Sequence, residues 1–238
     1  MKRILIKTLA GGMLAALSTG AQATTIIATF NSMTPSSGVT VTYPSTTTNT
    51  SAGRFNFTRV GGDHPQTPLP DSPVSRIWAF CVELGQSIST GDTVTFDVLP
   101  LESGSNVSGG IGVARADALR ELLGAVYPDF SQVLTNNQYA ALQIAIWEIT
   151  RENVGLYGYD VSTGDVKFSG STATILGLAN TYLSQVDGVG PRAQRIRALV
   201  NERKQDMLVQ FPVPEPGSLA LALLGLGAVF GTRRRATA

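Results

Sequence analysis

Short apolar runs beside basic residues stand at both ends of the 238-residue chain, and they leave only the middle to fold as a domain. The first end reads MKRILIKTLAGGMLAALSTGAQATT, in which a small-x-small pattern at residues 21–23 follows the apolar run. This order is typical of a secretory signal peptide, which we expect over residues 1–23. Export leads to an oxidising compartment, where the single cysteine, Cys81, has no second cysteine to pair with. A lone thiol there is a hazard if it stays free, so Cys81 needs an explanation.

The other end reads VPEPGSLALALLGLGAVFGTRRRATA. Its apolar stretch is short, but residues 217–232 could cross a thin bilayer, and we expect a transmembrane helix there. The cluster Arg233, Arg234 and Arg235 follows at once and reads as a stop signal on the cytoplasmic side. The body of the chain would then lie outside the cytoplasm.

The order of these C-terminal parts resembles the PEP-CTERM sorting signal of Gram-negative bacteria, which we place at residues 213–238. Its tripeptide lies within Val213-Pro214-Glu215-Pro216, and the apolar helix and the arginines follow in order. The resemblance implies recognition by an exosortase-type enzyme and removal of the tail. The protein would sit in the inner membrane through its C-terminal helix before processing, and then at the cell surface or in the extracellular matrix. The prolines favour an extended strand that a protease-like groove can bind, and Glu215 is the acid on which we expect sorting to depend.

Removing both ends leaves residues 24–212, a length that suits one domain. Of the 18 basic residues, three lie in the signal peptide and three in the tail, so 12 face 17 acids and the body carries about −5. This balance argues against nucleic-acid binding, which needs clustered positive charge. One cysteine and one histidine cannot build a zinc site alone, and we expect no metal or cofactor. The sequence has no Gly-x-Ser-x-Gly, and His64 is most simply an exposed loop histidine, so a hydrolase has little support.

The first part of the domain alternates apolar and polar residues in the manner of β-strands. Residues 24–30, 38–44 and 53–60 read as three strands separated by turn residues, with a polar loop over 44–53. The proline-rich stretch 61–73 is expected to be a long exposed loop. Two further strands are predicted, one in an apolar segment at 77–84 and one in an alternating segment at 91–101.

Helical spacing begins at residue 116 and stops at Pro128. The clearest helix starts at Asn136, with Asn136 or Asn137 as its cap. A short hairpin is expected over 155–170, a helix over 171–186, and a helix or a late strand near the end of 191–211. The sequence therefore predicts an α+β fold, with one β-rich extracellular domain and a few inserted helices.

Tyr139, Gln143 and Trp147 follow one another at intervals of four, so on a helix they project from one side. Gln143 is a polar amide on this apolar face, and a buried amide without partners is unfavourable. The simplest explanation is a hydrogen bond from Gln143 to the backbone of a neighbouring strand.

Two motifs together give Gln143 a second interpretation. Residues 80–83 read Phe-Cys-Val-Glu, and residues 142–147 read Leu-Gln-Ile-Ala-Ile-Trp. The pair resembles the thioester (TQxA-type) domains of Gram-positive surface adhesins, in which such a cysteine and glutamine condense into an internal thioester. Leu142 stands where that family has Thr, so a hydroxyl beside the glutamine is missing.

The resemblance implies that Cys81 attacks the side-chain carbonyl of Gln143, displaces ammonia and leaves an electrophilic thioester. Such a site must hold the two groups in contact and exclude water. The expected pocket residues are Phe80, Tyr139, Ala145 and Trp147, with Trp78 as a further candidate. A surface amine or a sugar hydroxyl would attack the thioester once, so we expect a chemical fastener and no turnover enzyme.

Two hypotheses remain open at this point. The first is an adhesin or matrix component whose Cys81–Gln143 thioester links to an amine or to a polysaccharide. The second is a passive structural or exopolysaccharide-associated surface protein, in which Cys81 is merely buried and Gln143 merely hydrogen-bonded.

Overall fold

The structure, a computed structural model, describes residues 24–64, 76–105 and 110–211, without the side chains of residues 156 and 157. The expected signal peptide, the expected span at 217–232 and the sorting segment lie outside the described residues. Within them the mixed α+β class is confirmed, because strands dominate and helices are few. The elements are β1 (Thr24–Thr42), β2 (Thr47–Gly61), β3 (Arg76–Cys81), β4 (Thr93–Pro100), η1 (Leu101–Ser103), α1 (Gly112–Val126), α2 (Asn136–Arg151), α3 (Val154–Tyr157), β5 (Lys167–Ser169), α4 (Ala173–Leu183), β6 (Ile196–Val200) and β7 (Met207–Gln210).

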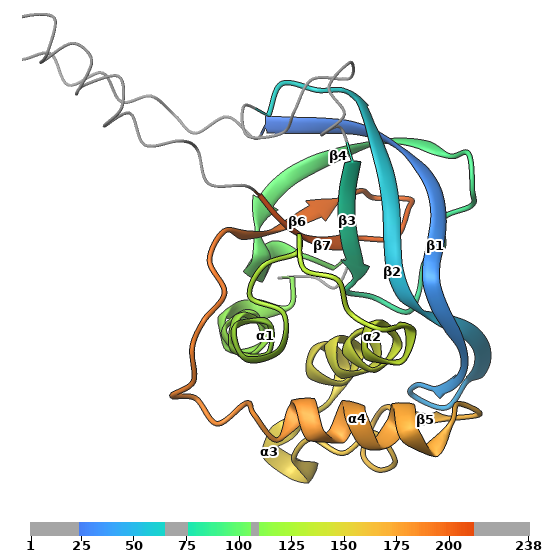
Figure 1. The fold of residues 1–238 in the computed structure, drawn as a ribbon, viewed down its shortest axis with the longest axis vertical. Coiled ribbons are helices and arrows are strands. Elements are labelled where there is room, and N and C mark those ends of the chain that lie inside the picture. Colours follow the sequence, from blue (N-terminus) through green and yellow to red (C-terminus); the bar gives the residue numbers. More distant parts are fainter. Residues whose placement is uncertain (1–23, 65–75, 106–109, 212–238) are drawn as a thin grey trace, which may run out of the picture.

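The strands form one antiparallel sheet that closes on itself. Its order is β2-β3-β7-β6-β4-β1-β5, and β1 pairs with β2 as well, so the first six strands make a complete ring. Strand β5 continues from the ring by pairing with the last residues of β1. Figure 1 shows the ring in the upper half of the molecule and helices α1, α2 and α4 gathered below it. Closure gives each of the six strands a partner on both sides over at least part of its length.

Strand β1 is longer than the sequence predicted. The expected strands 24–30 and 38–44 are parts of one strand, which stays paired with β2 across register shifts near Phe30/Ser32 and Met33/Ser36. The polar loop expected over 44–53 is therefore wrong, because β2 already begins at Thr47. The many threonines of both strands explain the difference, since β-branched side chains fit a paired strand whose face is half exposed.

Aromatic residues fill the closed sheet. Phe30 and Phe57 have ring centroids 5.2 Å apart, and Phe57 meets Phe96 edge-on at 5.9 Å. All three side chains are buried, so the alternating segments of β1, β2 and β4 turn their aromatic positions to one core.

Helix α2 runs through the centre of the molecule between the sheet and the other helices (Figure 1). Every side chain from Tyr139 to Thr150 is buried, so the helix has no solvent face over that range. Its cap is Thr135, which forms a capping box with Gln138, and the expected cap at Asn136 or Asn137 is wrong by one residue.

Two other expectations on the helical part need correction. Helix α1 begins at Gly112, four residues earlier than expected, although it does end before Pro128. The hairpin expected over 155–170 is absent, because α3 occupies its start and β5 pairs with β1 instead. Of the two alternatives near the end of 191–211, the late strand is confirmed as β7, and it pairs with a further strand, β6. The helix expected over 171–186 is confirmed as α4.

Among residues 24–64, 76–105 and 110–211, no helix combines the length and the apolar character needed to cross a membrane.

Candidate functional site

Cys81 is the last residue of β3, and the side chain of Gln143 lies against its backbone. Strand β2 pairs with β3 only from Thr58↔Arg76 to Phe55↔Ala79, so Cys81 lies beyond the end of that ladder. There the N–H of Cys81 donates to Gln143 Oε1 at 2.9 Å, and Gln143 Nε2 donates to the carbonyl of Cys81 at 2.8 Å. The side-chain amide thus takes the role of a strand's peptide group.

This contact confirms the simplest expectation for Gln143, which was a hydrogen bond to the backbone of a neighbouring strand. It also places the amide carbon of Gln143 beside the residue whose thiol would attack it. Both residues are fully buried, with an exposed fraction of 0%. The arrangement is therefore compatible with each of the two hypotheses drawn from the sequence.

The thiol of Cys81 is held away from water. Its Sγ donates to the carbonyl oxygen of Glu83 at 2.7 Å, and the N–H of Glu83 lies 3.3 Å from the sulfur as a donor. Burial raises the pKa of Cys81 to about 12, although the backbone of Glu83 and the indole of Trp147 act in the opposite direction. The indole Nε1 of Trp147 is turned toward the sulfur but does not reach the geometry of a full hydrogen bond. The thiol is therefore protonated at neutral pH.

The expected pocket residues are all buried, and most of them belong to aromatic clusters. Phe80 meets Tyr139 at 6.5 Å between ring centroids, and Trp147 stacks on Phe168 at 6.3 Å. Ala145 is buried on the same helix. Trp78 is only half buried, and it packs on the guanidinium of Arg54, 4.6 Å from its ring centroid.

Glu83 has a structural role that the sequence did not indicate. Its Oε1 accepts from the N–H of Asp206 at 2.8 Å, while the N–H of Val82 donates to the carbonyl of Asp206 at 3.1 Å. Asp206 in turn accepts from the N–H of Asn201 at 2.7 Å. Burial, together with the charge of Glu83, raises the pKa of Asp206 to about 7. These contacts fix the start of β7 beside the end of β3.

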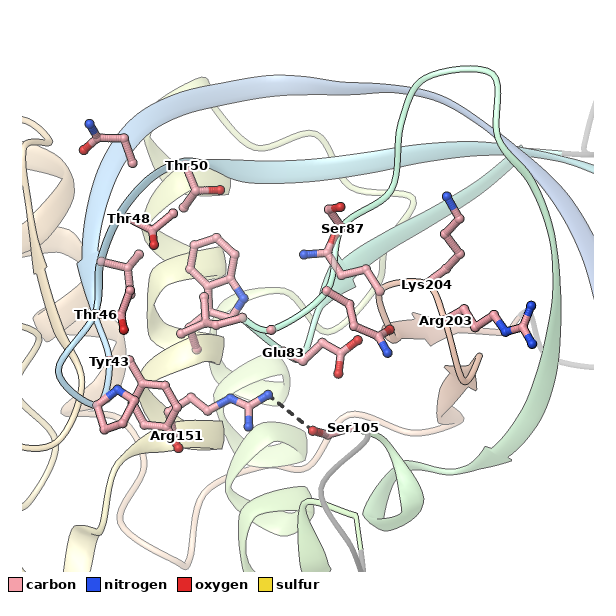
Figure 2. Close-up of a pocket in the computed structure, with 18 residues that line it drawn as sticks. Tyr43, Thr46, Thr48, Thr50, Glu83, Ser87, Ser105, Arg151, Arg203 and Lys204 are labelled. Carbon is pink, nitrogen blue, oxygen red and sulfur yellow. Dashed lines mark hydrogen bonds between the residues drawn. The ribbon is translucent and has the colours of Figure 1, made fainter.

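A cleft of about 1100 Å³ reaches this region from the surface. Figure 2 shows Thr46 of the β1–β2 turn and Thr48 and Thr50 of β2 along one side and Ser87 and Lys204 along the other. Glu83 and Arg151 lie between the two sides (Figure 2). The cleft is also lined by Trp147, which lies one helical turn after Gln143, and Glu83 itself lies two residues after Cys81.

Sequence reasoning missed this cleft and misplaced His64. The clue to the cleft was the threonine-rich segment over 44–53, which reads as an unremarkable polar loop until its partners are known. His64 is not an exposed loop residue: its ring stacks on Phe211 at 4.3 Å and only 9% of it is exposed. Burial lowers the pKa of His64, and the nearby charges of Arg59 and Arg197 lower it further. The described part of the chain contains no group of three metal-ligating side chains.

The sorting motif at 213–216 and the arginines at 233–235 lie outside the described residues. Residues 212–235 match a family described as the PEP-CTERM protein-sorting motif. This match supports the expected sorting signal, and it implies export, processing by an exosortase and sorting to the surface. No curated protein and no solved structure matches the chain. The comparisons give no support to the resemblance to thioester domains.

Proposed function

We propose that this exosortase-sorted surface protein attaches covalently to its surroundings through a thioester between Cys81 and Gln143. The observation that carries the proposal is the pair of hydrogen bonds between the Gln143 amide and the backbone of Cys81. It joins the chain's single cysteine to the one glutamine that the second motif singles out. The protein would then be an adhesin or a matrix component that reacts once and does not turn over.

The hydrogen bonds between the Gln143 amide and the Cys81 backbone support thioester formation. The sulfur of Cys81 bonds to the side-chain carbonyl carbon of Gln143, the carbon–nitrogen bond breaks, and ammonia leaves with the thiol proton. The N–H of Cys81 already donates to Oε1, so it is placed to stabilise the negative charge that develops on that oxygen. Since burial holds the pKa of the thiol near 12, the proton must move as the sulfur–carbon bond forms.

Burial supports the proposal as well, because a thioester is lost to hydrolysis in contact with water. Phe80, Tyr139 and Trp147 belong to the packed aromatic surroundings of the pair. An outside nucleophile would arrive from the cleft, past Glu83 and Trp147, which line it.

The second candidate is the passive surface protein, and a specific observation favours it as well. Both polar atoms of the Gln143 amide are paired, and the Cys81 thiol has its own acceptor in Glu83. In that case the Gln143 amide only satisfies the N–H and the carbonyl of Cys81 where strand β2 no longer reaches them, and no covalent bond forms.

Intact mass spectrometry of the purified chain separates the two. A thioester makes the protein lighter by one ammonia, and added methylamine converts it to a methylamide with release of an alkylatable thiol. The matched control is Cys81→Ala, which cannot lose ammonia by this route. A wild-type chain at full mass, with Cys81 alkylated quantitatively after unfolding and without methylamine, would contradict the thioester.

The sorting part of the proposal has its own test, Glu215→Ala. We expect the unprocessed chain of this variant to remain in the membrane with its tail attached, as seen by immunoblotting of membrane fractions. Normal tail removal would show that Glu215 is not needed for recognition.

A further inference from the structure

Three buried polar atoms without a partner in the protein belong to residues that line the cleft: Trp147 Nε1, Arg151 Nε and Gln86 Oε1. Buried polar atoms in folded proteins are nearly always hydrogen-bonded, so their gathering around one cavity needs a reason. Two of them are donors and one is an acceptor. Since the Trp147 indole acts on the Cys81 sulfur, a ligand in the cleft that carries hydroxyl groups and anionic oxygens would pair with Arg151 Nε and Gln86 Oε1.

The hydroxyl groups of the cleft extend this pattern. Thr46, Thr48 and Thr50 lie along its β1–β2 side, and Ser87 lies opposite them (Figure 2). The aromatic ring of Tyr43 lies beside Arg151, whose guanidinium carbon is 5.7 Å from the ring centroid. A wall of hydroxyls with an aromatic face and a fixed guanidinium suits a sugar chain, since each sugar ring offers several hydroxyls and an apolar face.

The charges of the residues that line the cleft indicate which class of sugar chain it would bind. The cleft carries three cations, Arg151, Arg203 and Lys204, although the body of the chain is acidic overall. Lys204 is partly neutralised by Asp92 at 2.6 Å, and the carboxylate of Glu83 accepts from the backbone of Asp206. The two arginines present planar donors that match a carboxylate. The same charges would repel the ammonium group of a lysine.

We propose that this cleft binds an acidic polysaccharide of the uronate type, and that one of its hydroxyls is the nucleophile that attacks the thioester. The second half of this statement rests on the proposed function. In that step the hydroxyl oxygen bonds to the carbonyl carbon of Gln143 and the carbon–sulfur bond breaks. The hydroxyl proton passes to the sulfur, so the Cys81 thiol is restored and the glycan is held by an ester.

Oligogalacturonate serves as the acidic probe, and a neutral galactan oligomer of equal length serves as its control. Calorimetry with the purified chain should show oligogalacturonate binding that weakens with salt, and binding of the neutral oligomer that is weaker by about tenfold or more. Arg203 is exposed and Arg151 is partly buried. The changes Arg203→Gln and Arg151→Gln should each weaken oligogalacturonate binding by about tenfold. The control Arg192→Gln lies outside the cleft, where Arg192 pairs with Asp117, and should bind as the wild type does.

Equal binding of the acidic and neutral oligomers, no binding of either, or unchanged affinity in both cleft variants would overturn the proposal. So would preferential covalent attachment of a lysine-rich peptide over oligogalacturonate. The Cys81→Ala variant separates this proposal from the thioester, because it should bind oligogalacturonate without forming an adduct. If that variant and the wild type both bind but the wild type forms no ester, the glycan cleft stands and the attack by a sugar hydroxyl fails, while intact mass and methylamine decide whether the thioester itself forms. If methylamine reveals a thioester but oligogalacturonate does not bind, the thioester stands and the glycan cleft fails.

Discussion

Helix α2 and the residue at its C-terminal cap make two kinds of buried polar contact, and each kind satisfies backbone groups of a neighbouring segment in a different way. Gln143 pairs with the end of β3 as both donor and acceptor. Glu152 holds a loop only as an acceptor: its oxygens receive the N–H groups of Asp165 at 2.9 Å and of Val166 at 3.3 Å. Glu148 does the same for the N–H of Asp160 at 2.9 Å.

The difference is one of charge. A neutral amide can replace a peptide group in a strand ladder at any pH, because it does not titrate. A buried carboxylate gives strong hydrogen bonds but pays a desolvation penalty when it ionises. Burial raises the pKa of Glu148 to about 8, and the charges of Glu152 and Asp160 add to this effect. The contact that positions Cys81 is thus independent of pH, whereas the contact made by Glu148 is not.

The largest loss of stability is expected from Gln143→Leu. This change leaves the N–H and the carbonyl of Cys81 buried without partners, and each such group costs about 1–3 kcal/mol. We expect the free energy of unfolding to fall by about 4 kcal/mol in urea titrations. The neighbouring control Leu142→Met keeps the side-chain volume and should lose less than about 1.5 kcal/mol. If Gln143→Leu lowers the free energy of unfolding no more than the control does, the hydrogen bonds of the Gln143 amide do not stabilise the end of β3.

A smaller and more local loss is expected from Glu152→Ala. The change removes the acceptor of three backbone N–H groups, those of Asn153, Asp165 and Val166. We expect a loss of about 2–3 kcal/mol, with faster amide hydrogen exchange at Asp165 and Val166. Glu152→Gln keeps one carbonyl acceptor, so its free energy of unfolding should lie between those of the wild type and Glu152→Ala. Unchanged exchange at both positions would show that Glu152 does not hold this loop.

The pH dependence of stability tests the acidic side of the comparison. Since the pKa of Glu148 is about 8 in the folded chain against a reference value of 4.5, the folded state keeps a proton that the unfolded state releases. This contribution is complete below pH 4.5 and is lost as the pH rises through 8. The Glu148→Gln variant should therefore gain stability relative to the wild type, by about 2 kcal/mol between about pH 5 and about pH 9.

Asp206, with its pKa of about 7, acts in the same direction and should leave a residual slope in Glu148→Gln. The measurement is the free energy of unfolding at a series of pH values for both proteins. Parallel curves for Glu148→Gln and the wild type would contradict the assignment to Glu148.

The smallest effect is expected from Thr135→Ala, which removes the cap of the helix that carries both contacts. The loss should be about 1 kcal/mol, and the equivalent change at the cap of α4, Thr172→Ala, should lose a similar amount. Hydrogen exchange should rise in the first turn of α2 and stay unchanged at Cys81 and Val166. A selective rise at either of those two residues would mean that the cap supports one contact in particular.

The sequence predicted those parts of the fold that depend on local pattern. The alternation at 91–101, the apolar run at 77–84 and the long helix from Asn136 all became elements close to their expected bounds. Local pattern also indicated that the Gln143 amide needs a strand as its partner. Two short motifs, and no periodicity, pointed to Cys81 as that partner.

The remaining features depend on long-range contacts that local pattern does not record. The closed ring requires β1 to pair with both β2 and β4, and the threonines of β1 and β2 look like loop residues without those partners. Gly164, at φ 86°, packs so closely on the Glu152 carboxylate that no side chain would fit, and neither residue reveals this in the sequence. The cleft likewise needs the β1–β2 turn to face residues 203–205, far along the chain.

The place of β7 in the ring has a mechanical consequence. Met207 lies opposite Cys81 in the β3–β7 ladder, and β7 ends at Gln210, just before the matched sorting segment begins at residue 212. A pull between a bond at Gln143 and the sorting segment would therefore enter the fold through helix α2 and leave it through β7. The short ladders that hold β7 on its two sides, to β3 from Ala79↔Val209 to Cys81↔Met207 and to β6 from Ile196↔Gln210 to Leu199↔Met207, would resist its removal.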